Sequence, residues 1–201
     1  MLDPNFVFAG AALTLAGALG YARRTVRGET RPNRVTWGLW SLAPLIAGSA
    51  QLSEGQGLGA VLAFSVGLGP LIVFVSSFLS THAHASLGGF DLACGLLSVL
   101  ALILWLVLDS GTVAISMSIA ADAFAAVPTL LKSIADPDSE HPAVFRNSAV
   151  NAAITLLTIR RWSYAAWGFP LWILVVCASL WAIIRWRIGP RLRDRQAASA
   201  A

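Results

Sequence analysis

The feature that most constrains this chain is a succession of long apolar runs whose arginines lie at their edges. Of the 201 residues, 57% are hydrophobic and only 12% are charged, and the mean hydropathy is +0.71. Soluble domains lie nearer half apolar and a quarter charged. A chain so poor in polar groups cannot cover its surface with them, so the solvent it expects is lipid.

A membrane-spanning helix needs about 20 mostly apolar residues, and seven stretches approach that length. The runs are too long for strands and lack strict alternation of apolar and polar residues. The sequence therefore predicts an all-α polytopic membrane protein with seven transmembrane helices. The predicted spans are residues Asn5–Tyr21, Val35–Leu52, Leu58–Leu79, Leu92–Leu108, Val113–Ile134, Val144–Ile159 and Tyr164–Ile184.

Two arginine clusters orient the predicted bundle. One follows the first span, from Arg23 to Arg34, and the other follows the last, from Arg185 to Arg195. Lys and Arg are enriched in cytoplasmic loops, and an odd number of spans places both clusters on that side. The N-terminal stretch MLDPNFVFAG lacks the basic region of a signal peptide, so a retained first helix is expected. We expect an inner-membrane protein with its N-terminus outside and its C-terminus in the cytoplasm.

The net charge of +4 and the pI near 9.8 do not indicate nucleic-acid binding, because the arginines do not line one soluble face. They predict attraction to anionic lipid headgroups at the loop and tail. His82 and His84 lack nearby cysteines or carboxylates, and Cys94 and Cys177 lie inside apolar runs. No familiar catalytic motif is present. We expect no metal, no cofactor and no enzymatic activity; association into a homo-oligomer is left open.

An internal repeat is suggested by the first three and the last three spans. Each set contains a helix, a polar loop with proline, a second helix and a third, and the third helices carry GLGPLIVFV (67–75) and WGFPLWILV (167–175). An unpaired fourth span would let both sets enter the membrane in the same direction, as in parallel-repeat transporters. The predicted divisions are a first repeat (1–80), a linker helix (81–110), a second repeat (111–187) and a basic tail (188–201).

This three-plus-one-plus-three organisation resembles the SWEET and PQ-loop superfamily of small-molecule transporters. That family commonly carries Pro-Gln near the end of the first helix of each repeat, where this chain has Gly20-Tyr21 and Pro128-Thr129. Its sugar-handling members have asparagine in the third helix of each repeat, and the third and seventh spans here have none. The resemblance implies the fold and a transport function, without implying a sugar substrate.

Polar side chains in hydrocarbon are costly unless they face a partner or a watery cavity, so their helical phase is informative. Three predicted helices each carry a polar stripe. The stripes are Trp37, Ser41, Pro44 and Gly48; Ser118, Asp122, Thr129 and Ser133; and Asn147, Asn151, Thr155 and Thr158. They would line one central cavity, or else bond neighbouring helices together.

Asp122, in the middle of its span, is the strongest candidate for a solute-binding residue. It would pair with a donor such as Asn151 or carry a proton, and a neutral structural acid is the alternative. Trp40, Ser41, Asn147 and Asn151 complete the predicted binding site. Trp40 lies deeper than Trp37, which we expect in the interfacial aromatic belt.

Four prolines occur inside predicted spans, and each removes a backbone hydrogen bond. Pro44, Pro70, Pro128 and Pro170 are therefore candidate hinges. The leading hypothesis is a carrier of a small polar or amphipathic solute that works by alternating access, with proton coupling through Asp122 as an option. The competing hypothesis is a membrane receptor or scaffold that uses the cytoplasmic Arg23–Arg34 loop.

Overall fold

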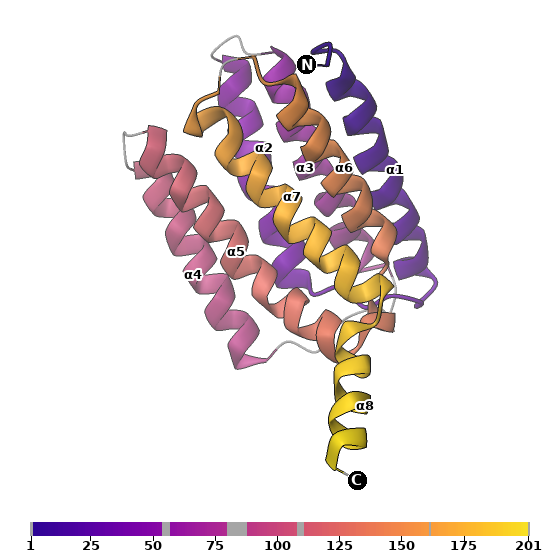
Figure 1. The fold of residues 1–201 in the computed structure, drawn as a ribbon. Helices are drawn as coiled ribbons and strands as arrows, with labels where there is room; N and C mark the ends of the chain where they lie inside the picture. Colours follow the sequence, from indigo (N-terminus) through magenta and orange to yellow (C-terminus); the bar gives the residue numbers. More distant parts are fainter. Residues whose placement is uncertain (1, 54–56, 80–87, 108–110, 161, 201) are drawn as a thin grey trace.

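The computed structural model describes residues 2–53, 57–79, 88–107, 111–160 and 162–200, and a few side chains within these ranges are not described. In these ranges the chain contains eight α-helices, one short 3-10 helix and no strand (Figure 1). The helices are α1 (Phe6–Val26), α2 (Arg34–Ser53), α3 (Gly57–Ser76), α4 (Gly89–Val107), α5 (Gly111–Ala135), η1 (Pro137–Ser139), α6 (Pro142–Thr158), α7 (Tyr164–Arg185) and α8 (Ile188–Ala200).

The all-helical fold predicted from the sequence is confirmed, and each predicted span coincides with one helix from α1 to α7. The largest difference lies in α1, which continues beyond Tyr21 to Val26 because Ala22–Val26 carry good helix formers and no breaker. The basic tail, for which no secondary structure was predicted, forms α8. Its Leu, Arg, Gln and Ala residues favour helix although they form no long apolar run.

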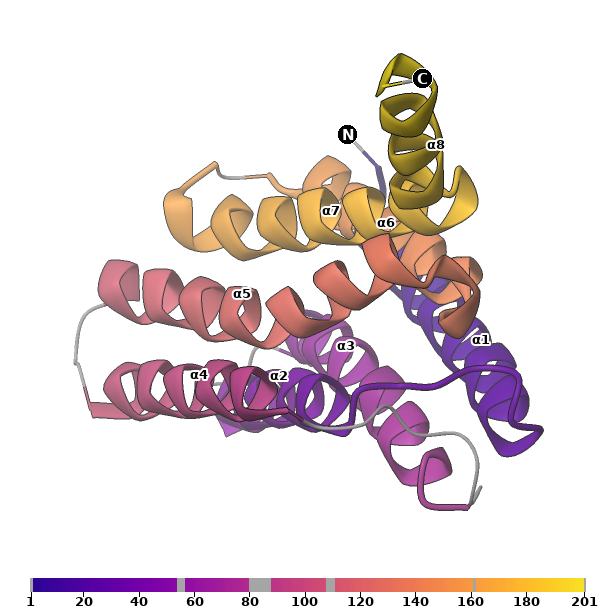
Figure 2. The same ribbon diagram turned by 90° about the horizontal axis from the view of Figure 1, so that it is seen from below.

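The packing of the helices is similar in the first three and the last three. Helix α3 contacts both α1 and α2, and α7 contacts both α5 and α6, so the third helix of each triplet lies between the other two. Two further contacts join the triplets, α1 with α6 and α2 with α5. These two contacts are equivalent by the repeat: if α1 and α2 are replaced by their counterparts α5 and α6, and the reverse, the α1–α6 contact becomes the α5–α2 contact. Helix α4 lies outside this arrangement, against α5 and α2 (Figure 2).

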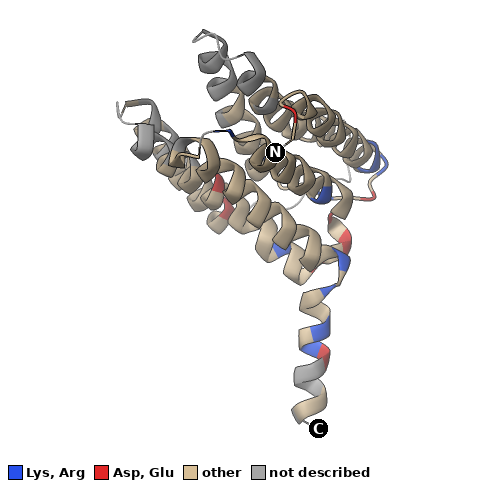
Figure 3. Cartoon of the chain, turned by 45° about the horizontal axis from the view of Figure 1, so that its top comes forward, with Lys and Arg blue, Asp and Glu red and all other residues tan. Residues whose placement is uncertain are grey.

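The two chain termini lie at opposite ends of the bundle (Figure 1). At one end, the backbone N–H of Leu2 donates to the carbonyl of Leu157, 3.1 Å away. At the other end the α1–α2 connection lies against the α5–α6 connection, where the N–H of Arg31 donates to the carbonyl of Ser139 at 2.8 Å. Most Lys and Arg residues lie at helix ends, in the connections and along α8 (Figure 3).

Two helices, Phe6–Val26 and Ala166–Arg185, are long and apolar enough to cross a membrane. Among the described residues, two further apolar helical segments, Ala63–Ser76 and Gly89–Leu100, are shorter than a membrane span requires. The core helix of a soluble protein can pass the same test of length and composition. The seven-span topology therefore stays a prediction.

All four candidate hinge prolines lie inside helices: Pro44 in α2, Pro70 in α3, Pro128 in α5 and Pro170 in α7. Their function as hinges stays a prediction. In α5, upstream of its proline, hydroxyl groups of neighbouring helices bond to backbone carbonyls. The Thr36 hydroxyl donates to the carbonyl of Ala125 and the Ser98 hydroxyl to that of Ala121, both at 2.7 Å. These bonds tie α5 to α2 and α4; they do not reach the carbonyl of Phe124, which is the one that Pro128 leaves without its helical donor.

Candidate functional site

A central cavity lies between the two triplets. It encloses about 520 Å³ of empty space, including the part that opens to the outside, but it has room for only a few water molecules. Six helices contribute to its described lining, and α4 contributes no residue to it. The lining comprises Thr14 and Ala18 of α1; Trp37 and Trp40 of α2; Val66, Gly69 and Pro70 of α3; Asp122 of α5; Val144, Phe145 and Ser148 of α6; and Ile173, Val176 and Cys177 of α7.

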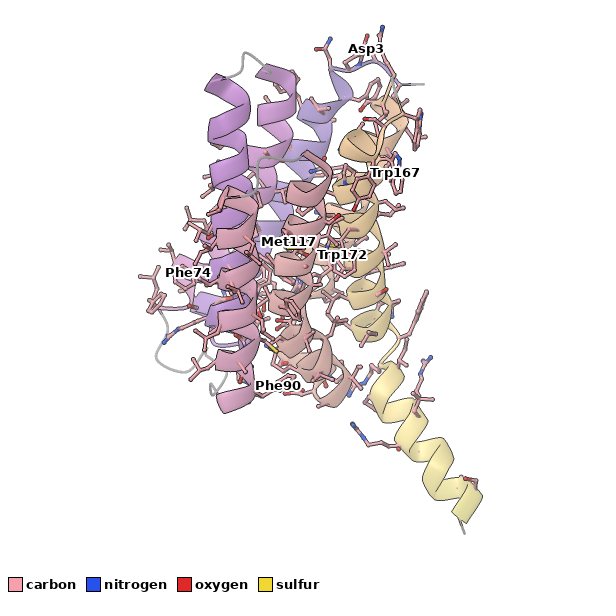
Figure 4. The ribbon with its side chains drawn as sticks, turned by 90° about the vertical axis from the view of Figure 1, so that its left-hand side faces the viewer. Asp3, Phe74, Phe90, Met117, Trp167 and Trp172 are labelled. Atoms are coloured by element: carbon pink, nitrogen blue, oxygen red, sulfur yellow. The ribbon has the colours of Figure 1, made fainter. Side chains whose placement is uncertain are left out.

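Asp122 is the one charged side chain in the described lining of this cavity. Its carboxylate oxygen Oδ2 accepts a 2.6 Å hydrogen bond from the indole Nε1 of Trp172. Trp172 lies at mid-height of the bundle (Figure 4). The indole of Trp40 donates to the backbone carbonyl of Asp122 at 3.4 Å. Two of the predicted site residues, Trp40 and Asp122, are therefore in contact, and a tryptophan orients the carboxylate.

The donor proposed for Asp122 from the sequence was wrong. Asn151 lies in the interface between α6 and α1, where its side-chain amide donates to the hydroxyl of Thr14 at 2.8 Å. Asn147 lies on the same interface and donates to the carbonyl of Leu13 at 2.9 Å. Neither asparagine lines the cavity. On α6 the polar stripe thus bonds neighbouring helices, which was the second of the two interpretations.

Two glycines of α1 explain why the asparagines fit there. A Cβ atom at Gly10 would lie 2.1 Å from Oδ1 of Asn151, and one at Gly17 would lie 3.0 Å from Nδ2 of Asn147. These glycines are seven residues apart, so they share one face of the helix. The close approach of α1 and α6 requires small residues at these two positions.

Three other hydroxyls of the stripes bond within their own helices, whereas those of Thr129 and Ser133 are buried and have no hydrogen-bond partner among the described residues. The Ser41 hydroxyl donates to the carbonyl of Gly38 at 2.7 Å and does not line the cavity. The Thr155 and Thr158 hydroxyls likewise donate to carbonyls of α6. The side chains of Ser118 and of the residues around Gly48 lie outside the described part of the chain. The cavity is therefore much less polar than the stripes predicted.

Four aromatic rings pack together beside the cavity, and three of them, Trp37, Trp40 and Phe145, line it. The ring of Trp37 lies 4.9 Å from that of Tyr21, 5.5 Å from Trp40 and 5.9 Å from Phe145, measured between centroids. Tyr21, Trp37 and Phe145 are each at most 2% exposed. The expectation that Trp37 belongs to an interfacial belt was wrong, because the rings of Tyr21, Trp40 and Phe145 pack around it and bury it. We call Tyr21, Trp37, Trp40 and Phe145 the aromatic cluster.

Beneath the aromatic cluster lies a network of buried polar groups around Glu140. The side chain of Glu140 is fully buried, accepts a hydrogen bond from the Tyr21 hydroxyl and pairs with the ammonium of Lys132. The same ammonium donates to the backbone carbonyl of Arg31. This Glu140 network therefore joins α1, the end of α5 and both connections at a single point.

His141 adjoins this network at the start of α6 and is half-buried. Burial lowers the pKa of its imidazole below the usual value, and the nearby guanidinium groups of Arg24 and Arg146 lower it further, against the opposing charge of Glu29. His141 is thus held in its neutral form over a wider pH range than a free histidine.

Sequence reasoning missed several residues of the site. Trp172 was not singled out, although a lone acid in an apolar helix needs a donor and an indole N–H can supply it. Phe145 and Glu140 were also missed, since nothing in their local sequence shows that they face the bundle. Comparison of the chain with protein-family models, curated proteins and solved structures found no match. The function must therefore be inferred from the residues and their geometry.

Proposed function

We propose that this protein is a membrane carrier for a small solute, which moves by alternating access between the two triplets. In this proposal seven helices span the cell membrane, with the N-terminus outside and the C-terminus in the cytoplasm. The fold organisation is that of the SWEET and PQ-loop superfamily, in which α4 is a linker. The solute binds in the central cavity, beside Trp40 and Asp122.

The observation that carries this proposal is a cavity at the junction of the two triplets with a carboxylate at its wall. Carriers built from repeats hold their substrate at the interface between the repeats. Both triplets supply lining residues here, and a change in their relative tilt would alter every wall of the cavity at once. A cavity inside one triplet would offer no such coupling.

The surface of the bundle supports a lipid environment. Large apolar side chains are exposed along α4, including Leu92 (55%), Leu96 (72%) and Val107 (72%). In water such a continuous apolar face would be a strong aggregation risk, whereas in a bilayer it needs no cover. The sequence contains no Lys or Arg from Val35 to Leu131. Helices α3 and α4, the whole of α2 after its first residue Arg34, and α5 as far as Leu131 therefore carry no Lys or Arg that hydrocarbon would reject.

The aromatic cluster and the Glu140 network support a gate at the cytoplasmic end. Tyr21 belongs to both, because its ring packs against Trp37 and its hydroxyl bonds to Glu140. In the conformation described, these groups close that end of the cavity. Transport would require them to separate, and the bonds across the two connections would then break and re-form in each cycle.

Cys177 offers a direct test of alternating access, because it is a free thiol in the cavity lining. The only other cysteine, Cys94, is removed by Cys94→Ser. In right-side-out and inverted vesicles, we expect an impermeant maleimide to label Cys177 from each side, with opposite responses to Glu140→Gln. That change should speed labelling from the cytoplasmic side and slow it from the outside. Labelling from one side only, unaffected by Glu140→Gln, would contradict the carrier.

Proton coupling is tested separately at Asp122. Two described groups near its carboxyl both come from α7: the indole of Trp172 and the thiol of Cys177. If the carboxyl exchanges its proton with solute, Asp122→Asn abolishes the dependence of uptake on pH in proteoliposomes. Uptake by the variant that still responds fully to pH would remove Asp122 from the coupling step.

The receptor or scaffold hypothesis gains no comparable support. Most arginines of the Arg23–Arg34 loop make contacts within the chain: Arg24 and Arg27 pair with Glu29, and Arg31 pairs with Asp136. Arg34 bonds to Ser77 and lies 4.2 Å above the ring of Phe78. Charge reversal at Arg23 and Arg24 would abolish the function of a receptor and would leave a carrier largely active.

A further inference from the structure

We propose that the solute is a small organic cation with an apolar body, bound by the Asp122 carboxylate against the surrounding aromatic rings. This inference rests on the proposed function and names the class of substrate for the same cavity. Three observations lead to it: the charge of the lining, the rings around the carboxylate, and the scarcity of other polar groups.

The charge of the cavity is the first observation. The described lining contains one carboxylate and no Lys, Arg or His. Lys132, on the same helix as Asp122, lies ten residues away, which is about 15 Å along an α-helix, and it is already paired with Glu140. A carboxylate in an apolar cavity needs a counter-charge to stay ionised. The described lining supplies none, so a cationic solute fits where an anion would be repelled.

The hydrogen bonds of Asp122 leave room for that cation. The Trp172 indole donates to Oδ2 at 2.6 Å, and this bond leaves the other carboxylate oxygen, Oδ1, to the solute in our proposal. A single neutral donor fixes the direction of the carboxylate without neutralising it. An ammonium group has three donors, so one of them can bond to Oδ1 while the others remain available. Oriented by Trp172, the carboxylate would thus be prepared for an ionic hydrogen bond with the solute.

The rings near the carboxylate are the second observation. Trp37, Trp40 and Phe145 all line the cavity, and Trp40 contacts the backbone of Asp122. Aromatic faces attract ammonium groups, most strongly in tryptophan and most strongly where water is excluded. Rings also provide apolar surface for the body of the solute. A cavity with one acid and several rings therefore suits an amphipathic amine better than a neutral solute of the same size.

The scarcity of other polar groups is the third observation. Among the described lining residues, polar side-chain atoms besides those of Asp122 come from Thr14, Ser148, the thiol of Cys177 and the two indole groups. The Thr14 hydroxyl already accepts a bond from Asn151. A polyhydroxylated solute would lose its bonds to water and find few replacements. The remaining apolar lining suits a short hydrocarbon or aromatic body, although the cavity has room for only a few water molecules in this conformation and must widen to admit one.

Three probes of nearly equal size and different charge test this inference: benzylammonium, benzyl alcohol and benzoate. Binding to purified protein in lipid nanodiscs is measured by equilibrium dialysis, and empty nanodiscs correct for partition into lipid. We expect benzylammonium to bind at least about tenfold more tightly than benzyl alcohol, because charge pairing and cation–π contact both favour it. Benzoate should bind no better than it does to empty nanodiscs.

Variants locate the charge preference. Asp122→Asn should bring benzylammonium within about twofold of benzyl alcohol, whereas Asp122→Glu should keep most of the preference. Asp138→Asn is the matched control, because this exposed loop carboxylate pairs with Arg187 far from the cavity. It should bind all three probes as the unmodified protein does. Equal affinity of the unmodified protein for benzylammonium and benzyl alcohol would overturn the inference.

A measurement without substitution at Asp122 covers the case in which that variant does not fold. In the Cys94→Ser background, benzylammonium should slow maleimide labelling of Cys177, and equal benzyl alcohol should not. Equal protection by both probes would contradict the inference. Uptake then separates the two proposals. If benzylammonium binds but is not transported, the cationic ligand class is supported and the carrier is refuted. If only benzyl alcohol is taken up, the carrier is supported and the cationic substrate class is refuted.

Discussion

The substitution Glu140→Gln tests the buried network that joins the two connections. Glutamine keeps the shape of the side chain and removes its charge. Since the Glu140 side chain is fully buried, the carboxylate cannot exchange its protein partners for water. The amide oxygen can still accept from the Tyr21 hydroxyl, but the Lys132 ammonium loses its counter-charge.

The expected cost follows from the burial of the two partners. Removing one member of a fully buried ion pair destabilises a protein by about 3–5 kcal/mol, because the other charge is left unpaired. The Lys132 side chain is 19% exposed and keeps its bond to the Arg31 carbonyl, so part of that cost is relieved. A hydrogen bond to a charged group contributes about 1.5–3 kcal/mol. We therefore expect Glu140→Gln to lower the free energy of unfolding by about 2–3 kcal/mol.

For a chain of this length, 1 kcal/mol corresponds to a change in melting temperature of about 2–4 °C. Glu140→Gln should thus lower the apparent Tm in detergent by about 4–12 °C, as followed by circular dichroism at a fixed scan rate. Asp138→Asn is the control, since it breaks an exposed pair with Arg187 whose side chains are 68% and 55% exposed. Exposed pairs contribute about 0–1 kcal/mol, so the control should melt close to the unmodified protein.

Equal melting of Glu140→Gln and the control would refute the claim that the network is desolvated. A double-mutant cycle with Lys132→Met gives a further check. If Lys132 and Glu140 interact as described, the double variant should be less destabilised than the sum of the two single variants. Additive effects would mean that each residue acts through other contacts.

Three further predictions concern packing, pH and the hinges. Gly10→Ala should destabilise the bundle by about 1–3 kcal/mol through the clash with Asn151, whereas Gly20→Ala, where the added Cβ meets no atom within 4 Å, should not lower the Tm. Because the folded state lowers the pKa of His141, the unfolded chain binds its proton first as pH falls through about 6.5. The free energy of unfolding should therefore decrease as pH falls through that value, and His141→Gln should make the decrease smaller. Pro70→Ala should restore a helical hydrogen bond and leave Tm unchanged or raised, yet slow solute uptake; unchanged uptake would remove Pro70 from the hinges.

The sequence specified the helices well because the signal for each one is local. An apolar run of about 20 residues forms a helix whatever it packs against, and the arginine clusters marked the end at which the two connections meet. Helix α8 escaped this reasoning, since its polar sequence shows only a propensity for helix and no apolar run. Local patterns thus predicted where helices begin and end more reliably than what surrounds them.

The site was harder to predict. The helical phase shows on which face of its helix a residue lies, but it does not show which residue of another helix that face contacts. The asparagine stripe of α6 was found correctly, yet its phase alone could not distinguish a cavity from an interface. Its counterpart was present in α1, where Gly10, Thr14 and Gly17 form a face of small residues. Reading the two helices together would have paired the asparagines with that face and left Asp122 in need of another donor.

Trp37 shows the same limit of local sequence patterns, because it was expected at the membrane interface and is buried in the bundle. Its place near the start of an apolar run is typical of an interfacial tryptophan, but the ring is 2% exposed. The reason lies far along the sequence, in Phe145 beside it and in the Glu140 segment that covers Tyr21. The residues that close the cavity and the carboxylate that charges it therefore come from both triplets. If the two triplets move relative to each other, the gate cannot open without changing the wall on which Asp122 lies, which is the physical coupling that a carrier requires.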